Sequence, residues 1–413
     1  MNILFIHQNF PGQFKHIAPA LVEAGHNISA LVLGKIRTSE WKGVKLFRYT
    51  LERKNAEDAH PWTIDFESKV IRGEACLRAS LQLRKKGFRP EVIVAHPGWG
   101  ESLFLHEVWP DAKIKLYFEF FYHARGLDAG FDPEFSPSDP MDAGRVMLKN
   151  ANTLLHFQNI DSALCPTHWQ ASTFPAHMQN KITIIHDGID TDALIPNSSS
   201  SFTLPSGQKV TPADEVVTFV SRALEPYRGF HIFMRSLPRI IAERPGAQIL
   251  IVGKEGISYG PQPSDGVSWK TRFSMEVFQK LSESDRARVH FLDTIPYDQF
   301  KALLQVSSAH VYLTYPFVLS WSLLEAMSTG CAIVASNTDP VREAITHNET
   351  GLLVDFFNPE ALSNAIIALL IDSSLRARLG TAARNFAVSR YDLKSYCLPR
   401  QMSWVLNRDD NGN

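Results

Sequence analysis

Short apolar runs alternate with segments of helical periodicity along almost the whole chain. Several runs are apolar on both faces, which is typical of parallel strands covered by helices on both sides. The segments between them suit right-handed crossovers, so the pattern predicts a doubly wound α/β protein. The predicted strands are Asn2–His7, Ile28–Leu33, Val44–Tyr49, Glu91–His96, Ile114–Phe120, Leu164–Thr167, Ile182–His186, Val216–Ser221, Gln248–Gly253, Val289–Asp293, His310–Tyr315, Ala332–Ser336 and Gly351–Val354.

One segment interrupts this alternation. Residues 196–214 contain three prolines and four consecutive serines, and they divide the chain into halves that each hold a full set of strands. We therefore expect two lobes with a cleft between them: a first domain at 1–195, the linker 196–214 and a second domain at 215–385. The final segment, 386–413, is mostly of helical pattern and is expected to cross back to the first domain.

Charge and cysteine usage exclude several classes of protein. The 42 Lys and Arg residues nearly balance the 43 Asp and Glu residues, so the chain lacks the basic field expected of a nucleic-acid binder. A hydrophobic content of 44% is that of a compact globular protein. Four scattered cysteines, Cys76, Cys165, Cys331 and Cys397, form no C-x-x-C pair. Neither a disulfide framework nor a zinc site is predicted, and a reducing compartment is the simpler interpretation.

The start of the chain lacks the pattern of a secretory signal. Four apolar residues, Ile3 to Ile6, follow Met1 and Asn2, whereas a signal peptide has a basic start and a longer apolar stretch. No run approaches the ~18 apolar residues of a membrane span. The sequence therefore predicts a soluble cytoplasmic protein, and contact with the inner face of a membrane, if any, would be peripheral.

The first strand runs into a turn that contains Gly12. A glycine between a buried strand and a helix allows the backbone to approach a phosphate, and the helix N-terminus supplies amide donors. The segment from His7 to Phe14 has one glycine and does not match G-x-G-x-x-G. An ordinary strand-to-helix turn explains it equally well.

Two arginines follow the first strand of the second half. Arg222 and Arg228 lie in the segment SRALEPYRG, at the end of a strand where open α/β sheets bind ligands. Two guanidinium groups directed at one crevice suit a diphosphate, and each charge-assisted hydrogen bond contributes ~1.5–3 kcal/mol. Two solvated arginines around a turn are the alternative.

The segment from Tyr315 to Cys331 passes from the end of a strand into a helix. Glu325 falls within the apolar stretch LLEAM, and an unpaired buried carboxylate costs several kcal/mol, so it should find hydroxyl or amide donors. A ribose diol would serve, as would a structural partner. The backbone amides of residues Leu319, Ser320, Trp321 and Ser322 open this helix, where they can face a sugar or a phosphate.

No histidine or aspartate pattern predicts a metal site. The histidines have no H-E-x-x-H or similar ligand spacing. His123 follows the predicted strand that ends at Phe120, and this places it near the ligand edge of the first lobe. Asp190 and Asp192 form a D-x-D sequence, but they follow a strand and a glycine, where turns and helix caps are common.

With these segments in hand, the chain resembles a retaining glycosyltransferase of family 4, the nucleotide-sugar-dependent group 1 class with two facing Rossmann-like domains (GT-B). The resemblance runs nearly end to end. The helix that carries the glutamate, with its continuation EAMSTGCAIVAS, is its most specific part. The other matching stretches are NILFIHQNFPGQFKHIAPAL, IIHDGIDTDALIP, VSRALEPYRGF, LIVGKEG, VHFLDTIPYDQFKALLQVSSAHVYLTYPF and GLLVDFFNPEAL.

The resemblance implies that the first domain, 1–195, binds the acceptor and that the second, 215–385, binds the nucleotide sugar. It also implies a role for each of these positions. Arg222 and Arg228 match the family's basic pair on the donor diphosphate, and Glu325 matches the glutamate that holds the ribose hydroxyls. Gly12 would lie under the diphosphate, with Gln13 beside it. Residues Leu319, Ser320, Trp321 and Ser322 match the loop whose amides meet the donor sugar and phosphate, and His123 matches a histidine beside the transferred sugar.

One position departs from the family pattern. Relatives carry a second glutamate eight residues before the ribose glutamate, near the donor sugar, and here that position is Phe317. The departure puts the sugar contacts in doubt but not those to the diphosphate or ribose. Residues 121–150 carry no motif, although Asp128, Asp132, Glu134 and Asp139 suit either carbohydrate hydroxyls or an ordinary surface loop.

The resemblance implies a hexosyltransferase that moves a sugar from a nucleotide diphosphate sugar to a glycan or lipid-linked acceptor, in cell-surface polysaccharide biosynthesis, with no cofactor and no metal. Neither the base, the acceptor nor the oligomeric state can be read from the sequence. A nucleotide-sugar 2-epimerase on the same fold would act without an acceptor. A glycan phosphorylase would need a pyridoxal lysine, for which no recognisable context exists. A degenerate nucleotide-sugar-binding subunit, motivated by Phe317, would bind the donor without transfer.

Overall fold

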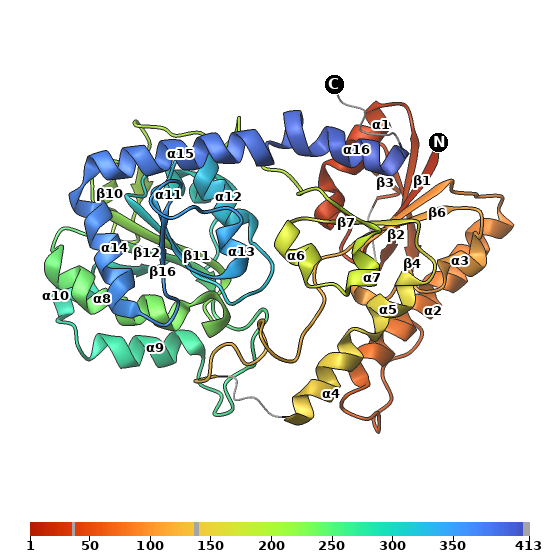
Figure 1. The fold of residues 1–413 in the computed structure, drawn as a ribbon, viewed down its shortest axis with the longest axis horizontal. Coiled ribbons are helices and arrows are strands. Elements are labelled where there is room, and N and C mark those ends of the chain that lie inside the picture. Colours follow the sequence, from red (N-terminus) through yellow and green to blue (C-terminus); the bar gives the residue numbers. More distant parts are fainter. Residues whose placement is uncertain (35–37, 136–139, 408–413) are drawn as a thin grey trace. The chain divides into compact units, whose positions relative to one another are not determined.

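The computed structural model describes residues 1–34, 38–135 and 140–407 (Figure 1). Its contacts divide the chain into two compact units. The first unit comprises Met1–Asp187 and the segment from Lys394 onward, and the second comprises Gly188–Leu393. The boundaries between the units, after Asp187 and after Leu393, thus differ from the boundaries after 195 and 385 that the sequence pattern predicts.

The first unit is built on an eight-stranded sheet with the order β3-β4-β2-β1-β5-β6-β7-β8. All neighbouring strands are parallel except the β3–β4 pair. Their carboxyl ends therefore share one edge of the sheet. The strands are β1 (Asn2–Ile6), β2 (Asn27–Leu33), β3 (Glu40–Trp41), β4 (Val44–Tyr49), β5 (Val92–Ala95), β6 (Lys113–Tyr117), β7 (Ser162–Cys165) and β8 (Ile182–Ile184).

Alternate residues of β1 enter two different cores. Ile3 and Phe5 belong to one buried cluster, and Leu4 and Ile6 belong to another. Because successive side chains of a strand point to opposite faces, helices cover both faces of this sheet. The first-unit helices before the return of the chain are η1 (Gly12–Lys15), α1 (Ile17–Glu23), α2 (Ile64–Lys85), η2 (Pro97–Trp99), α3 (Leu105–Val108), α4 (Pro140–Lys149), α5 (Ala151–Phe157), α6 (His168–Ser172) and α7 (Ala176–Gln179).

The last helix, α16 (Leu398–Leu406), packs on the first unit beside α1 (Figure 1). Its Val405 is fully buried in the same cluster as Ile3 and Phe5. Lys115 of β6 donates a hydrogen bond to the carbonyl oxygen of Trp404, and Gln401 donates to that of His186 at 2.7 Å. The end of the chain thus completes one face of the first sheet.

The second unit has a six-stranded, all-parallel sheet with the order β13-β12-β11-β14-β15-β16. A two-stranded antiparallel hairpin, β9–β10, precedes it within residues 196–214, and Phe202, Leu204 and Val210 of this segment are buried in the second unit's core. The strands are β9 (Phe202–Thr203), β10 (Lys209–Val210), β11 (Val216–Ala223), β12 (Gln248–Lys254), β13 (Val289–Phe291), β14 (Ala309–Tyr312), β15 (Ile333–Ser336) and β16 (Leu352–Val354).

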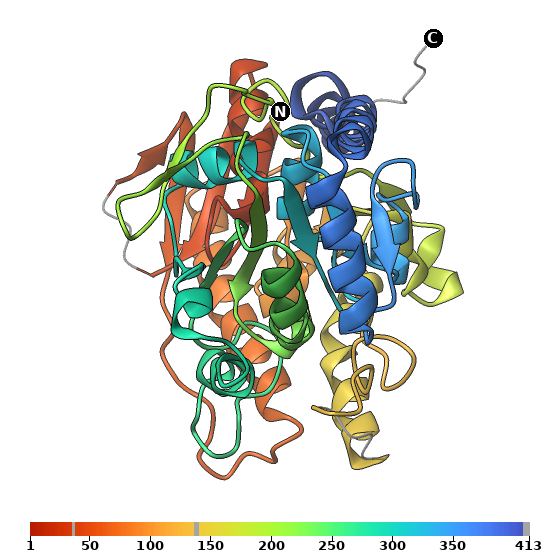
Figure 2. The same ribbon diagram turned by 90° about the vertical axis from the view of Figure 1, so that its left-hand side faces the viewer.

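Helices also cover both faces of the second sheet. On one face α8 and α14 lie side by side (Figures 1 and 2), and Phe233 of α8 stacks on Phe219 of β11 at 4.8 Å between ring centroids. On the other face α12 packs against α15. The helices are η3 (Pro226–Arg228), α8 (Phe230–Glu243), α9 (Trp269–Phe278), α10 (Glu283–Arg286), α11 (Tyr297–Gln305), α12 (Trp321–Ser328), α13 (Asp339–Arg342), α14 (Pro359–Ile371), α15 (Ser373–Tyr391) and the π-helical turn η4 (Leu393–Cys397) that leads to α16.

The sheets confirm the class predicted from the apolar pattern. Every predicted strand is present, with bounds that differ by a few residues, and the helical pattern after Leu362 is α14, α15, η4 and α16. The pattern missed the two-residue strands β3, β9 and β10, because so few residues leave no detectable periodicity. Within the described residues, no helix combines the length and the apolar character that crossing a membrane requires.

Candidate functional site

The predicted residues of the second unit gather at the carboxyl edge of its sheet. Arg222 lies at the end of β11, Arg228 ends the turn η3 that follows it, and Glu325 lies on α12, which begins after neighbouring β14. This edge is where open parallel sheets bind ligands. The geometry of each side chain shows what it can do there.

Arg228 is held inside the unit by partners from β14 and the loop after it. Its Nη1 donates hydrogen bonds to the hydroxyl oxygens of Thr314 and Tyr312, at 2.6 and 3.3 Å. Nη1 and Nη2 also donate to the carbonyl oxygen of Val318, at 3.3 and 3.4 Å, and the ring of Tyr259 lies 5.2 Å from the guanidinium carbon. With only 6% of the residue exposed, the guanidinium brings a positive charge underneath the loop that leads into α12.

Arg222 differs from Arg228 because it is exposed. No hydrogen bond or ion pair joins it to any other residue of 1–34, 38–135 or 140–407. A guanidinium group that no internal acceptor engages keeps all five of its N–H donors for a ligand. Of the two arginines, Arg222 is therefore the one able to contact an anion directly, and Arg228 acts from behind.

The start of α12 uses the backbone amides of Ser320 and Ser322 internally. Ser320 caps the helix: its Oγ accepts a hydrogen bond from the N–H of Ser322 at 3.3 Å, and its own N–H donates to the Tyr312 hydroxyl at 2.9 Å. Leu319 is buried in the core, whereas Trp321 is half-buried. Tyr312 thus connects this helix start to Arg228.

Glu325 lies one turn into α12, half-buried, and accepts a hydrogen bond from a hydroxyl group. The phenol of Tyr297 donates to Glu325 Oε1 at 3.0 Å, and Tyr297 is itself 54% exposed. Burial and the Glu325 carboxylate both raise the pKa of Tyr297, so the phenol keeps its proton at neutral pH. The carboxylate is therefore positioned to accept hydrogen bonds from hydroxyl groups at the surface.

Glu225 is a buried residue of this edge that the sequence did not single out. Its carboxylate accepts hydrogen bonds from the backbone N–H groups of Ser258, Tyr259 and Gly260, at 3.0 to 3.3 Å. Burial raises the pKa of Glu225 although these bonds favour the ionised form. The signal was an acidic residue between Arg222 and Arg228 at a strand end. Its carboxylate anchors the loop that places Tyr259 over Arg228.

Phe317, where the chain departs from the pattern of its relatives, is buried rather than exposed at the edge. Its ring lies 5.2 Å from those of Tyr227 and Tyr259, measured between centroids. Aromatic packing thus replaces a carboxylate at this position. A sugar bound at this edge would meet no acidic side chain from residue 317.

In the first unit, Gly12 and Gln13 lie at the corresponding edge, after β1. A side chain at Gly12 would overlap the imidazole of His7, and the backbone there has a φ of 47°, so only glycine fits. Gln13 is held between two partners: its Oε1 accepts from His7 Nε2 at 2.8 Å, and its Nε2 donates to Glu119 Oε1 at 3.0 Å. The turn is fixed by this network, which sequence reasoning did not predict.

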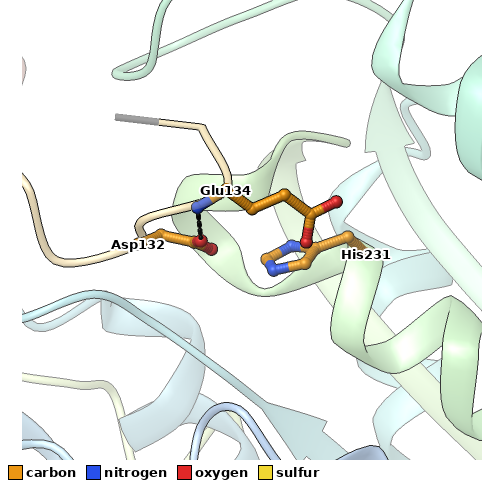
Figure 3. Close-up of side chains that lie close together, drawn as sticks. All are labelled: Asp132, Glu134 and His231. Carbon is orange, nitrogen blue, oxygen red and sulfur yellow. Dashed lines mark hydrogen bonds between the residues drawn. The ribbon is translucent and has the colours of Figure 1, made fainter. Parts of the chain in front are cut away.

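His123 is exposed, and its Nε2 is 2.7 Å from the carbonyl oxygen of Thr173, to which it donates. The loop that follows contains the acidic residues noted above. Figure 3 shows that the backbone N–H of Glu134 donates to the carboxylate of Asp132, at 3.0 Å, which forms a local turn. Asp139 lies outside the described residues. Asp190 accepts a hydrogen bond from the N–H of Ala193 at 3.1 Å, as in a turn or cap.

Comparison with protein families gives one match in each half of the chain. The family described as "Glycosyl transferase family 4 group" matches residues 24–194, and the one described as "Glycosyl transferases group 1" matches residues 205–386. Together these two ranges include Arg222, Arg228 and Glu325 but not Gly12.

Curated relatives are glycosyltransferases. The chain is 30% identical over 185 residues to the phosphatidyl-myo-inositol mannosyltransferase of Mycobacterium tuberculosis, a match that covers 43% of each protein. It is 22% identical over 207 residues to the D-inositol 3-phosphate glycosyltransferase of Corynebacterium glutamicum, covering 49% of this chain and 47% of that one. The chain thus matches less than half the length of these relatives. Glycogen synthase of Mycobacterium tuberculosis is 24% identical over 396 residues, or 91% of this chain and 86% of the synthase.

Solved structures share the fold. Sucrose-phosphate synthase from Thermosynechococcus elongatus superposes with a TM-score of 0.71 at 17% identity, covering 99% of this chain and 98% of that one. Anabaena HepE, solved with UDP and glucose, gives a TM-score of 0.65 at 17% identity, covering 98% and 99%. At these identities the likeness shows the fold alone, and it confirms the GT-B class predicted from the sequence.

Proposed function

The chain belongs to the group 1 glycosyltransferases of family 4, and we propose that it moves a sugar from a nucleotide diphosphate sugar to a glycan or lipid-linked acceptor. The observation that carries this proposal is the carboxyl edge of the second unit's sheet. There an unengaged arginine, a buried arginine under a helix start and a hydroxyl-binding glutamate lie on adjoining elements.

Arg222 is the residue we assign to the diphosphate. Its guanidinium is exposed and can donate its N–H groups to the phosphate oxygens. The buried positive charge of Arg228 also attracts the diphosphate, without occupying the position where the diphosphate would bind. The start of α12 contributes the positive end of its dipole. These groups together suit two linked phosphates better than a single carboxylate.

Glu325 is the residue we assign to the ribose. It already accepts a hydrogen bond from the Tyr297 hydroxyl, and this supports the assignment because a sugar hydroxyl would donate in the same way. On this assignment a ribose hydroxyl either displaces the Tyr297 phenol from Glu325 Oε1 or donates to the other carboxylate oxygen while the phenol stays in place. The base would then lie beyond α11, which begins at Tyr297.

The mechanism of sugar transfer follows from where negative charge develops during the reaction. When the bond between sugar and diphosphate breaks, negative charge grows on the leaving phosphate, and Arg222, Arg228 and the positive end of the α12 dipole stabilise it. The acceptor oxygen attacks the anomeric carbon from the face that the diphosphate leaves, and a phosphate oxygen takes the acceptor's proton. The configuration is retained, and neither a metal ion nor a protein nucleophile is required.

Two relatives indicate which substrates to try first. HepE was solved with UDP and with UDP-glucose, so a uridine nucleotide is the first donor candidate. Phosphatidyl-myo-inositol mannosyltransferase is named for a lipid acceptor, which favours a lipid-linked or cell-surface glycan acceptor and peripheral membrane contact for this chain. The site itself recognises a diphosphate and a ribose, whatever the base.

Nucleotide binding tests the proposal. We expect one of UDP, GDP, ADP, CMP and dTDP to raise the melting temperature, since a ligand at 100 times its dissociation constant stabilises by about 2.7 kcal/mol. Arg222→Ala should weaken that nucleotide about 10-fold or more through the lost charge-assisted bonds. Arg239→Ala on α8, which pairs with Glu243 at the surface, is the matched control and should bind like the wild type. A thermal shift with none of the five nucleotides, or an Arg222 variant that binds normally, would contradict the assignment.

The alternative functions can be distinguished in the same experiment if the fate of the bound donor is also measured. A bound donor that is epimerised without an acceptor would identify a 2-epimerase. A bound donor that is neither hydrolysed nor transferred to any acceptor would identify a nucleotide-sugar-binding subunit, which the packing of Phe317 keeps open as a candidate.

A further inference from the structure

Three aromatic rings pack together beside the buried guanidinium of Arg228. They belong to Tyr227 of η3, Tyr259 of the loop after β12 and Phe317 of the loop after β14, and we call them the aromatic cover. The ring centroids are 5.2 to 5.6 Å apart in all three pairs. The Tyr259 ring lies 5.2 Å from the guanidinium carbon of Arg228, and only 6% of Arg228 is exposed. Segments that are distant in the sequence thus meet beside one positive charge.

Tyr259 is the outer member of the aromatic cover. It is 40% exposed, whereas Tyr227 and Phe317 are 8% and 6% exposed. One part of its ring therefore faces solvent, while another part lies against Arg228 and the two buried rings. A ring in this position limits the access of water to the guanidinium.

The loop that carries Tyr259, residues 255–268, contains no helix or strand and is held by the carboxylate of Glu225. The backbone N–H groups of Ser258, Tyr259 and Gly260 all donate to this carboxylate, at 3.0 to 3.3 Å. Glu225 is itself fully buried. Because the three N–H groups are successive, one acceptor fixes the path of the backbone through Tyr259. The carboxylate thus determines where the Tyr259 ring lies.

Glu225 also fixes the arginine on the other side of this contact. Its backbone carbonyl oxygen accepts a hydrogen bond from the N–H of Arg228 at 3.3 Å, within the turn η3. The side chain of Glu225 therefore holds Tyr259, and its main chain holds Arg228. A cation over an aromatic face is stabilised most when water is excluded from the pair. Both partners of the ring–guanidinium contact thus depend on one residue.

We propose that Glu225 and Tyr259 are positioning residues for sugar transfer, which keep water away from Arg228 so that its charge acts undiminished on the leaving phosphate. The inference rests on the transferase activity proposed above and names two further residues that its rate requires. The attraction between two charges falls as the surrounding dielectric constant rises, so an arginine opened to water stabilises the same phosphate less. Both residues act through Arg228 and not by contact with the donor.

The same arrangement gives Phe317 a part in the reaction. Its buried ring contacts both Tyr227 and Tyr259, so it supports the outer ring from the interior of the unit. A carboxylate at this position would lose both ring contacts, each of which adds to the stability of the packing. On this account the aromatic residue at 317 supports the action of Arg228.

Steady-state kinetics of the full chain, with the nucleotide sugar whose nucleotide raises the melting temperature, test the proposal. Tyr259→Leu should lower kcat about 10-fold with little change in KM for the donor, because charge develops on the leaving phosphate only as the bond breaks. The kcat of the wild type should be nearly independent of salt. That of Tyr259→Leu should fall as salt rises to about 0.5 M, since ions then reach Arg228.

Two matched variants define what the Tyr259 ring contributes. Tyr259→Phe keeps the ring and should behave as the wild type does. Ile257→Ala changes an exposed residue of the same loop and should leave kcat and its salt dependence unchanged. The melting temperatures of these variants and of Tyr259→Leu should stay near that of the wild type, because both side chains are partly in solvent.

A double-mutant cycle shows whether Glu225 acts through Tyr259. Glu225→Gln replaces an accepting oxygen by an NH₂ group, which cannot accept from the loop, and should by itself lower kcat about 10-fold. In the Tyr259→Leu background it should add little, since both changes release the same contact. If Glu225→Gln does not fold, the kinetics and salt dependence of the Tyr259 variants decide the matter alone.

The outcomes separate this inference from the proposed function. A Tyr259→Leu variant with the kcat and salt dependence of the wild type, or losses from Glu225→Gln and Tyr259→Leu that multiply, would overturn the inference. The transferase proposal would then stand, because the wild type still transfers sugar. A wild type that transfers no sugar from any nucleotide sugar would contradict the proposed function, and this inference with it.

Discussion

Glu101 is a fully buried carboxyl group at the start of the segment after η2. The Tyr49 hydroxyl donates to its Oε1 at 2.9 Å, while Oε2 has no hydrogen-bond partner among the described residues. Burial raises the pKa of Glu101, opposed by the Tyr49 hydrogen bond and by the charges of Arg72 and His96, and the buried Cys76 thiol adds no compensating charge. A single residue thus makes the stability of the first unit depend on pH.

We predict that Glu101→Gln stabilises the protein at neutral and alkaline pH. A carboxyl whose pKa is raised on folding contributes its stability below the pKa of the unfolded chain and loses it as the pH rises through the folded value. The amide keeps an oxygen for Tyr49 and carries no charge, so the variant should unfold with about 1 kcal/mol or more of added free energy at high pH. Urea unfolding of both proteins from acidic to alkaline pH measures this.

The added stability should vanish at acidic pH, where Glu101 is protonated in both folded and unfolded wild type. Glu107→Gln on α3, which is exposed, should change the free energy of unfolding at neither pH. A Glu101 variant that is destabilised at all pH values would show that the carboxylate is needed in its charged form.

At the scale of residues, the sequence indicates where a side chain lies in the fold better than which partners it has. The exposed Arg222 and the hydroxyl-binding Glu325 lie where strand ends and helix pattern place them. The burial of Arg228 was not predictable, because its partners Thr314 and Val318 come from another strand end and become neighbours only through strand pairing. The contacts of Glu119 with Gln13 and His96 likewise join residues that are far apart in the sequence.

At the scale of elements, α12 owes its position to α15. The two helices pack closely because Gly380 of α15 lies against the backbone of Gly330, just after α12. A methyl group at Gly380 would overlap the Gly330 carbonyl oxygen, and backbone cannot turn aside as a flexible side chain can. Glycine is therefore required for the contact that supports the helix carrying Glu325.

We predict that Gly380→Ala destabilises the second unit, although alanine favours helix formation by about 1 kcal/mol over glycine. Overpacking of a close contact costs about 1–3 kcal/mol and should displace α12. The melting temperature and the affinity for nucleotide should both fall. Gly246→Ala is the control, because a methyl group there meets nothing within 4 Å. Equal melting temperatures for the two variants would contradict the packing argument.

Elements were more predictable from sequence than side-chain roles. Buried parallel strands are apolar along their whole length, and their alternation with helical segments survives in the pattern even at low similarity to other proteins. The hairpin β9–β10 escaped because a serine- and proline-rich composition indicates a linker, whereas Phe202 and Val210 bury two short strands in the second unit. The composition of a segment indicates how exposed it is on average, and it does not show which single side chains are buried.

At the scale of the molecule, the chain passes between its units twice. Ile189 and Asp392 pair where it does so: Ile189 N–H donates to the carbonyl oxygen of Tyr391 at 2.7 Å, and the N–H of Leu393 donates to that of Ile189 at 2.8 Å. The two crossing segments therefore run side by side within the second unit. After the second crossing, α16 returns to the first unit and buries Val405 there. The first unit is thus built from two separate stretches of the sequence, whereas the second, Gly188–Leu393, is continuous.

Transfer of a labelled sugar from the nucleotide sugar selected by thermal shift, measured with EDTA present, tests the activity of the whole chain most directly. The account predicts one nucleoside diphosphate released per sugar transferred, retention of the anomeric configuration, and no loss of rate in EDTA. Arg222→Ala and Glu325→Ala should each lower kcat/KM by about 10–1000-fold, the scale of a few kcal/mol of transition-state stabilisation, while Arg239→Ala should not. Wild-type turnover in both site variants, or turnover that stops when metal is removed, would contradict it.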